Sequence, residues 1–186
     1  SLGSYNTRKH TLKFSTGLLK EHFEIAGRLS NIASEGYIDR ARSDLKSYFL
    51  QGAFKDHNTL IKAIAFGGTE ETYQAWYGIP ESRLNGDIDG MNNYITNNFL
   101  DEEEANNLLN SDSRTYNPYT YNNQVDNYRQ DYYQLHYSYE FNKKWNTNLA
   151  LHYTRGKGYY EEFKKAEAFS NYGLDNVIIG SDTIAE

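Results

Sequence analysis

Apolar and polar residues alternate with a period of two along much of this chain. Residues 131–156 show this most clearly. One apolar set is Tyr133, Leu135, Tyr137, Tyr139 and Phe141, and after the break at Asn142, Lys143 and Lys144 a second set is Trp145, Thr147, Leu149, Leu151 and Tyr153. Successive side chains of a β-strand point to opposite faces. The pattern therefore predicts two antiparallel strands, residues 131–141 and 145–155, joined by a tight turn.

Four earlier segments also have strand character. They are residues 11–19, 23–33, 45–54 and 59–72. The connections between the six segments alternate between short and long along the chain. We expect an antiparallel meander with tight turns at one end and extended loops at the other.

The region between residues 73 and 128 has no sustained alternation, and it contains the one helical signature. Residues 101–109 read DEEEANNLL, where Asp101 is placed to cap a helix and Glu104 follows three residues later, as in a capping box. The alternative is an acidic cation site. We expect a short helix in an external loop, because metal cages need oxygens arranged by a turn.

Strand length and loop asymmetry favour a membrane barrel over a soluble sandwich. Soluble strands most often have about 5 or 6 residues, whereas a tilted strand needs about 9 to 11 to cross a bilayer. Short turns at one side, long loops at the other and aromatic girdles are typical of outer-membrane barrels. Trp145, directly after a turn, suits the periplasmic girdle.

The composition agrees with this interpretation. Only 38% of the 186 residues are hydrophobic, and the mean hydropathy is −0.83. Disorder is disfavoured by 18 Tyr, 9 Phe and 2 Trp. A barrel needs apolar side chains only on its lipid face, so a polar average is expected.

Charge and cysteine content exclude several other classes. A net charge of −6 without a basic stripe argues against nucleic-acid binding, and the absence of cysteine excludes disulfides and thiolate metal sites. No apolar run is long enough for a membrane-spanning helix, and the residues from Ser1 have no signal-peptide character. We expect any export signal to lie outside this chain.

Three segments carry a resemblance to a known family. GYIDRARSDLKSYFLQGAF (residues 36–54), TYQAWYGIPESRL (72–84) and LALHYTRGKGYYEEFK (149–164) look like barrel segments of TonB-dependent outer-membrane receptors, of the iron-chelate and siderophore type found in Bacteroidetes-like bacteria. The resemblance implies an all-β fold with a barrel of about 22 strands around a plug. It also implies energy coupling through TonB, which binds the plug.

We interpret residues 1–186 as a partial barrel domain, about six strands with their loops, from a receptor of the bacterial outer membrane. The plug and the TonB-binding segment are not identifiable here. The expected partners are TonB through that absent segment, outer-membrane lipid, and a chelated nutrient such as an iron siderophore. No cofactor and no nucleic acid are expected.

Tyr and Trp in the long loops are the candidate substrate contacts, since they offer rigid faces with polar edges. These candidates are Trp76, Tyr77, Tyr116, Tyr119 and Tyr121. Packing between loops is an equally ready explanation for them. Arg155 and Lys157, near the external end of a strand, are candidates for attracting an anionic chelate, with a salt bridge to Glu161 or Glu162 as the alternative.

The histidines and the oxygen-rich loops are weaker candidates. His22 and His57 fall in predicted turns. His136 and His152 fall on polar faces of neighbouring strands and are expected to point into the lumen, without a third metal ligand. Residues 85–93 and 110–113 lack the spacing of a calcium loop, so polar loops are expected there and no metal site is assigned.

Enzymatic activity is not expected, because the chain contains no G-x-S-x-G, no H-E-x-x-H and no cysteine nucleophile. Two alternatives to the receptor stay open. One is a soluble extracellular β-sandwich that binds glycans or mediates adhesion, and the other is a passive porin.

Overall fold

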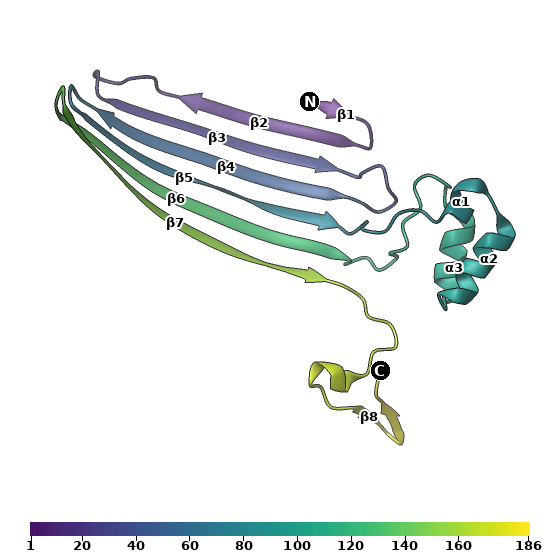
Figure 1. Cartoon of the computed structure of the whole chain (residues 1–186). Coiled ribbons are helices and arrows are strands. Elements are labelled where there is room, and N and C mark those ends of the chain that lie inside the picture. Colours follow the sequence, from purple (N-terminus) through teal and green to yellow (C-terminus); the bar gives the residue numbers. More distant parts are fainter.

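The computed structural model describes residues 1–186 and is dominated by one antiparallel sheet of seven strands in sequence order (Figure 1). The strands are β1 (Leu2–Gly3), β2 (Thr7–Ser15), β3 (Phe23–Ser34), β4 (Ser43–Lys55), β5 (Thr59–Tyr73), β6 (Val125–Asn142) and β7 (Trp145–Glu161). Each strand pairs with the next. The predicted all-β meander is therefore confirmed.

Five of the six predicted strands lie at the expected places, and the first one was misplaced. Residues 11–19 were predicted as a strand, but β2 is Thr7–Ser15 and Leu19 forms only an isolated bridge to Phe23. Lys20 and Glu21 have positive φ, so the chain turns there instead of continuing extended. β6 and β7 are 18 and 17 residues long, well beyond their predicted lengths, because pairing continues through the polar residues beyond the apolar stripe.

The β2–β3, β4–β5 and β6–β7 connections lie at one end of the sheet, and the β3–β4 and β5–β6 connections lie at the other (Figure 1). The β4–β5 and β6–β7 connections are short and the β5–β6 connection is long, as predicted. The β2–β3 connection, residues 16–22, is almost as long as the β3–β4 connection, residues 35–42, so the predicted tight turn after the first strand was wrong.

The β6–β7 turn is tight because one side chain bonds to its backbone. The Asn142 side-chain oxygen accepts hydrogen bonds from the backbone N–H groups of Lys144 and Trp145, at 2.9 and 3.2 Å. A side chain that satisfies its own turn in this way is a common use of Asn.

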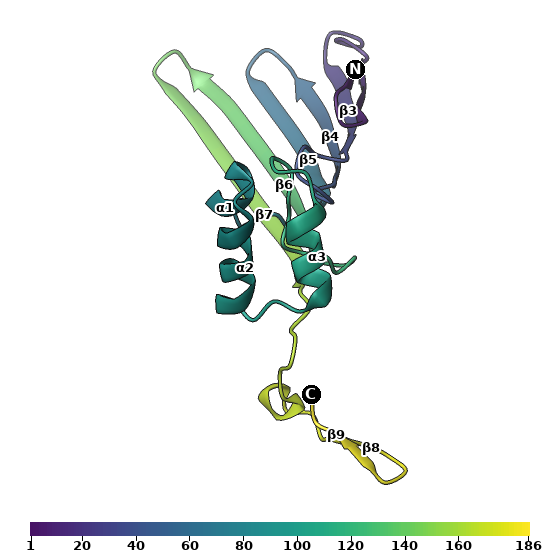
Figure 2. The ribbon, with the colours of Figure 1, turned by 90° about the vertical axis from the view of Figure 1, so that its right-hand side faces the viewer.

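The β5–β6 connection folds into a helical unit at the long-loop end, which faces the viewer in Figure 2. It contains α1 (Glu81–Asn85), α2 (Ile88–Asn97) and α3 (Glu102–Asn110). The predicted capping box of α3 is present, with Glu104 N–H donating to Asp101 Oδ1 and Asp101 N–H to Glu104 Oε2. The prediction of a single loop helix was wrong. Asp87 caps α2 within residues 85–93, which were predicted as a polar loop. Residues 80–84, the end of a segment likened to barrel strands, form the cap and most of α1.

The only packed core lies in this helical unit. Met91, Leu108 and Tyr116 form it, with Ile95 and Leu109 among the apolar side chains around them. Only 10 of 186 residues are buried, and most of these lie in the helical unit or where it joins the sheet. Neither face of the sheet is covered by a second layer.

A small C-terminal part follows β7. It consists of a 3-10 turn, η1 (Phe169–Tyr172), and the two-stranded hairpin β8 (Val177–Ile179) and β9 (Asp182–Ile184). The outer edge of β7 is left unpaired, and the outer edge of β2 meets only the two residues of β1. The sheet is therefore open at both sides.

Candidate functional site

The register of the sheet separates an apolar face from a polar face. Three successive rows across the strands place apolar and small residues side by side. These rows are Phe23, Phe54, Ile61, Tyr137 and Leu149; Ile25, Gly52, Ala63, Leu135 and Leu151; and Phe14, Gly27, Leu50, Ala65, Tyr133 and Tyr153. We call these three rows the apolar belt. Aromatic side chains occur in its two outer rows, and its middle row is aliphatic.

The opposite face carries most of the polar side chains at the same level, and we call it the polar face. These are Lys13, Arg28, Gln51, Lys62, Gln134, His136 and His152. The same rows also contain Ile64, Phe49, Phe66 and Tyr132, so this face is mixed in character. Alternation along each strand alone dictates this separation, because neighbouring residues point to opposite sides. The predicted face assignment of residues 131–155 agrees with the register of β6 and β7.

His136 and His152 share the polar face but are not cross-strand partners. His136 lies opposite Ala150, and His152 lies opposite Gln134. His136 Nε2 is 3.2 Å from Gln134 Oε1, and His152 Nε2 is 2.6 Å from Thr154 Oγ1. Each imidazole thus has a neutral hydrogen-bonding partner on its own strand. No group of three His, Cys, Asp or Glu residues in the chain is arranged to hold a metal ion.

Arg40, in the loop between β3 and β4, anchors the helical unit to the sheet. Its guanidinium donates from Nε to the carbonyl oxygen of Tyr119 at 2.7 Å and from NH2 to that of Asn117 at 2.8 Å. Sequence reasoning did not single out Arg40. It lies inside GYIDRARSD, the segment that carries part of the family resemblance, and its partners are more than seventy residues away.

Asn117 completes this junction from the other side. Its side chain is fully buried, and Nδ2 donates to the carbonyl oxygens of Asp39 and Gln74 at 2.9 and 3.0 Å. Its Oδ1 accepts from Tyr119 N–H at 3.2 Å. Because buried polar groups are costly when unpaired, these bonds fix the position of the segment that carries Tyr119.

Three of the predicted substrate-contact residues meet at the long-loop end. Trp76 and Tyr77 both pack on Tyr119, with ring centroids 6.5 and 5.8 Å apart. Trp76 and Tyr77 keep 64% and 68% of their surface exposed, so the cluster presents open aromatic faces. We call Trp76, Tyr77 and Tyr119 the aromatic cluster.

Tyr121 and Tyr116 lie apart from the aromatic cluster. The Tyr121 hydroxyl donates to Glu161 Oε1 at 2.6 Å, and its ring packs on Phe163. Tyr116 is only 3% exposed and belongs to the core of the helical unit. Burial raises the pKa of Tyr116 to about 12. Because its ring is packed away from solvent, Tyr116 stabilises the helical unit and is not positioned to contact a substrate.

Arg155 lies on the apolar face of the sheet, two residues beyond Tyr153 and opposite Asp131. Its neighbours in β7, Thr154 and Gly156, lie on the polar face. Neither Arg155 nor Lys157 forms a salt bridge to Glu161 or Glu162, since Glu161 accepts from Tyr121 and Glu162 pairs with Lys164. The sequence alone could have predicted the face on which Arg155 lies, because Arg155 is an even number of residues from Leu151 and Tyr153.

Asp131 joins three strands at the border of the apolar belt. Its side chain is 8% exposed, and its carboxylate accepts from Arg129 Nε at 2.9 Å and from the Tyr48 hydroxyl at 2.8 Å. Tyr48 lies on β4 and reaches β6 across Gly67 of β5, where a Cβ would lie 2.8 Å from Asp131 Oδ1. The glycine provides the space for this contact.

Comparisons with known proteins add no further constraint. The chain matches no protein-family model, and no curated protein and no solved structure is significantly similar to it. The resemblance to TonB-dependent receptors therefore stays a prediction from the residues. No helix in the structure is both long enough and apolar enough to cross a membrane.

Proposed function

We propose that this chain is part of the wall of a transmembrane β-barrel in the bacterial outer membrane, belonging to a TonB-dependent receptor. The observation that carries the proposal is the uncovered apolar belt. Its side chains on β7, Leu149, Leu151 and Tyr153, are 56%, 57% and 61% exposed. Such a surface is costly in water and is the kind of surface that the lipid face of a barrel presents.

The dimensions of the strands support the proposal. Between β2 and β7 the shortest strand has 9 residues and the longest 18, and a tilted strand needs about 9 to 11 to cross the bilayer. In this arrangement the short turns lie on the periplasmic side. The extra length of β6 and β7 extends beyond the membrane on the external side, where the helical unit lies.

The two ends of the proposed pathway follow from the same geometry. The polar face, with His136 and His152, lines the passage. The aromatic cluster lies at the external end, where a rigid chelate with flat, partly apolar groups would first meet the protein. The proposed cargo is a scarce chelated nutrient, with iron bound to a siderophore as the candidate, and TonB acting on a plug supplies the energy.

A soluble β-sandwich is the alternative from a different class. It would bury the apolar belt against a second sheet, and no element of this chain covers that face. A passive porin shares the wall but needs neither plug nor TonB. The two barrel alternatives therefore differ in energy coupling and not in the fold of this segment.

Uptake by cells tests the proposal. Cells expressing the intact receptor that contains this chain are given labelled ferric siderophore in the presence and in the absence of TonB. The proposal expects TonB-dependent accumulation and recovery of the chain in the outer-membrane fraction. Accumulation independent of TonB would favour the porin, and recovery as a water-soluble monomer would favour the sandwich.

A further inference from the structure

Three basic side chains form a row on the same face of the sheet as the apolar belt, separated from it by one row that contains Tyr48, Asp131 and Arg155. Lys46 of β4 lies opposite Thr69 of β5, Thr69 lies opposite Arg129 of β6, and Arg129 lies opposite Lys157 of β7. We call Lys46, Arg129 and Lys157 the basic row. We infer that the basic row binds the phosphate groups of anionic lipid in the external leaflet; this inference rests on the proposed function.

The spacing along the strands places the basic row at a headgroup layer. Ten residues of β6 separate Arg129 from Tyr139, an aromatic residue one row outside the apolar belt at the short-turn end, where we place the opposite headgroup layer. This separation is about 34 Å at ~3.4 Å per residue. A strand tilt of about 40° reduces this to ~26 Å along the membrane normal, close to the ~25 Å height of the apolar band of barrels. The basic row then lies where phosphate groups begin.

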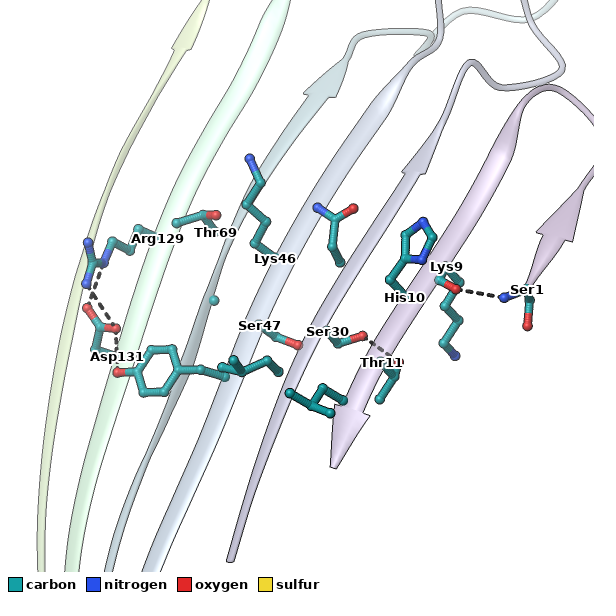
Figure 3. A pocket seen from close by; sticks show the side chains of 15 residues that line it. Ser1, Lys9, His10, Thr11, Ser30, Lys46, Ser47, Thr69, Arg129 and Asp131 are labelled. Atoms are coloured by element: carbon teal, nitrogen blue, oxygen red, sulfur yellow. Dashed lines mark hydrogen bonds and ion pairs between the residues drawn. The ribbon is translucent and has the colours of Figure 1, made fainter. Parts of the chain in front are cut away.

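The surface between the apolar belt and the basic row is hollowed. A hollow of ≈ 830 Å³ is lined by Leu12, Leu29 and Tyr48, which the register places in the row next to the belt. One row further out it is lined by His10, Lys46 and Arg129, which Figure 3 labels. The hollow thus has an apolar part facing the belt and a basic part facing outward. An anionic lipid has this same order of acyl chain and phosphate, so one occupant satisfies both parts.

The neighbouring acids do not cancel the row. Lys46 Nζ pairs with Asp44 at 3.2 Å, and Arg129 pairs with Asp131 at 2.9 Å. Lys157, and Arg155 one row closer to the belt, have no ion-pair partner within the chain and remain available. Exposed pairs such as that of Lys46 exchange readily for a better anion, since they contribute little by themselves.

Three matched double variants of the full chain test the inference. Lys46→Gln with Lys157→Gln removes two charges from the basic row and leaves the buried Asp131 contacts intact. Lys13→Gln with Lys62→Gln removes the same charge from the polar face. Lys46→Arg with Lys157→Arg keeps the charge and tests whether charge at these positions is sufficient, and circular dichroism of each variant checks that its sheet is folded. Association is measured by co-sedimentation with phosphatidylcholine vesicles, and with vesicles in which a minority of the lipid is phosphatidylglycerol.

Phosphatidylglycerol is expected to increase association of the unaltered chain, by roughly five-fold for each available basic residue near the anionic surface. The Lys46→Gln, Lys157→Gln variant should lose most of this increase, whereas the polar-face and arginine variants should keep it. Equal association with both kinds of vesicle, or an equal loss in the polar-face variant, would overturn the lipid-binding inference alone. No association with pure phosphatidylcholine would instead contradict the barrel wall itself.

Discussion

Arg40 donates a hydrogen bond to the carbonyl oxygen of Tyr119 across 79 positions of sequence, at 2.7 Å. This contact ties the loop between β3 and β4 to the loop that carries the aromatic cluster. The external end of the proposed receptor is therefore held together by a side chain that belongs to neither the apolar belt nor the polar face.

Replacing Arg40 by Ala should loosen the helical unit without unfolding the sheet. The change removes two charge-assisted bonds to backbone carbonyls, each of which contributes about 1.5 to 3 kcal/mol. Hydrogen exchange of the amides around Asn117 and Tyr119 should become faster, while that of β4 and β5 stays the same. Arg42→Ala is the control, because its polar contacts are exposed and as long as 3.5 Å. Equal acceleration in both variants would contradict the role of Arg40.

The cap of α3 should make part of the helical unit sensitive to acid. The Glu104 backbone N–H and the Lys165 ammonium, in this order, lower the pKa of Asp101 below its ordinary value. A carboxyl whose pKa is lower in the folded state stabilises that state above its unfolded pKa and loses this effect as pH falls through the folded pKa.

We therefore expect the helix signal to decrease as pH falls below about 4, near the ordinary pKa of Asp. Asp101→Asn should keep a cap and abolish this pH dependence, and Asp101→Ala should destabilise α3 by about 1 kcal/mol. Circular dichroism or NMR of the α3 amides measures the change. An acid transition in α3 that persists unchanged in Asp101→Asn would assign it to another group.

The aromatic cluster should contribute to ligand affinity in the intact receptor. Trp76→Ala or Tyr77→Ala removes one exposed ring, and a ring contact of about 0.5 to 1.5 kcal/mol corresponds to a roughly 2-fold to 10-fold weaker binding of ferric siderophore. Binding to whole cells measures this change. Phe99→Ala, which removes an 89% exposed ring from the same connection, is the control. Equal effects of all three variants would remove the cluster from the proposed binding surface.

Backbone strain at Gly36 offers a test of the same loop that holds Arg40. Gly36 has a φ of +78°, and a Cβ there would clash with the carbonyl oxygen of Ala41. Gly36→Ala should therefore cost more than about 1 kcal/mol of unfolding free energy. Gly52→Ala, on β4 with open space around it, should cost less. Denaturant titration of both variants measures the difference, and a larger loss in Gly52→Ala would be the contrary result.

The sequence predicted the parts of the fold that depend on local periodicity. The alternation of apolar and polar residues located β3 to β7. It also assigned the residues of β6 and β7 to the two faces of the sheet, because residues an even number of positions apart in a strand lie on the same face. The capping box located α3 for the same reason: Asp101 and Glu104 are only three residues apart. These features depend on neighbours in sequence.

The features that were missed depend on distant partners or on a local signal that was overlooked. α2 has a helical spacing of apolar residues, Ile88, Met91 and Ile95, behind the capping Asp87, and it is stabilised by Met91 packing against Leu108 and Tyr116. The partners of Arg40 and Asn117 lie far along the chain, so no local pattern indicates them. The basic row became visible only when the register aligned Lys46, Arg129 and Lys157 from three strands.

The face on which lipid lies is the central claim, and arginine substitution on the two faces of β6 and β7 tests it most directly. Tyr137→Arg and Leu151→Arg place a cation in the apolar belt, while Ser138→Arg and Ala150→Arg place the same cation on the polar face. The measurement is the free energy of assembly of each chain into phospholipid vesicles by denaturant titration. The first two variants should lose about 2 to 4 kcal/mol, and the other two should assemble like the unaltered chain. Normal assembly of Tyr137→Arg and Leu151→Arg, with failure of Ser138→Arg and Ala150→Arg, would contradict the proposed orientation of the sheet.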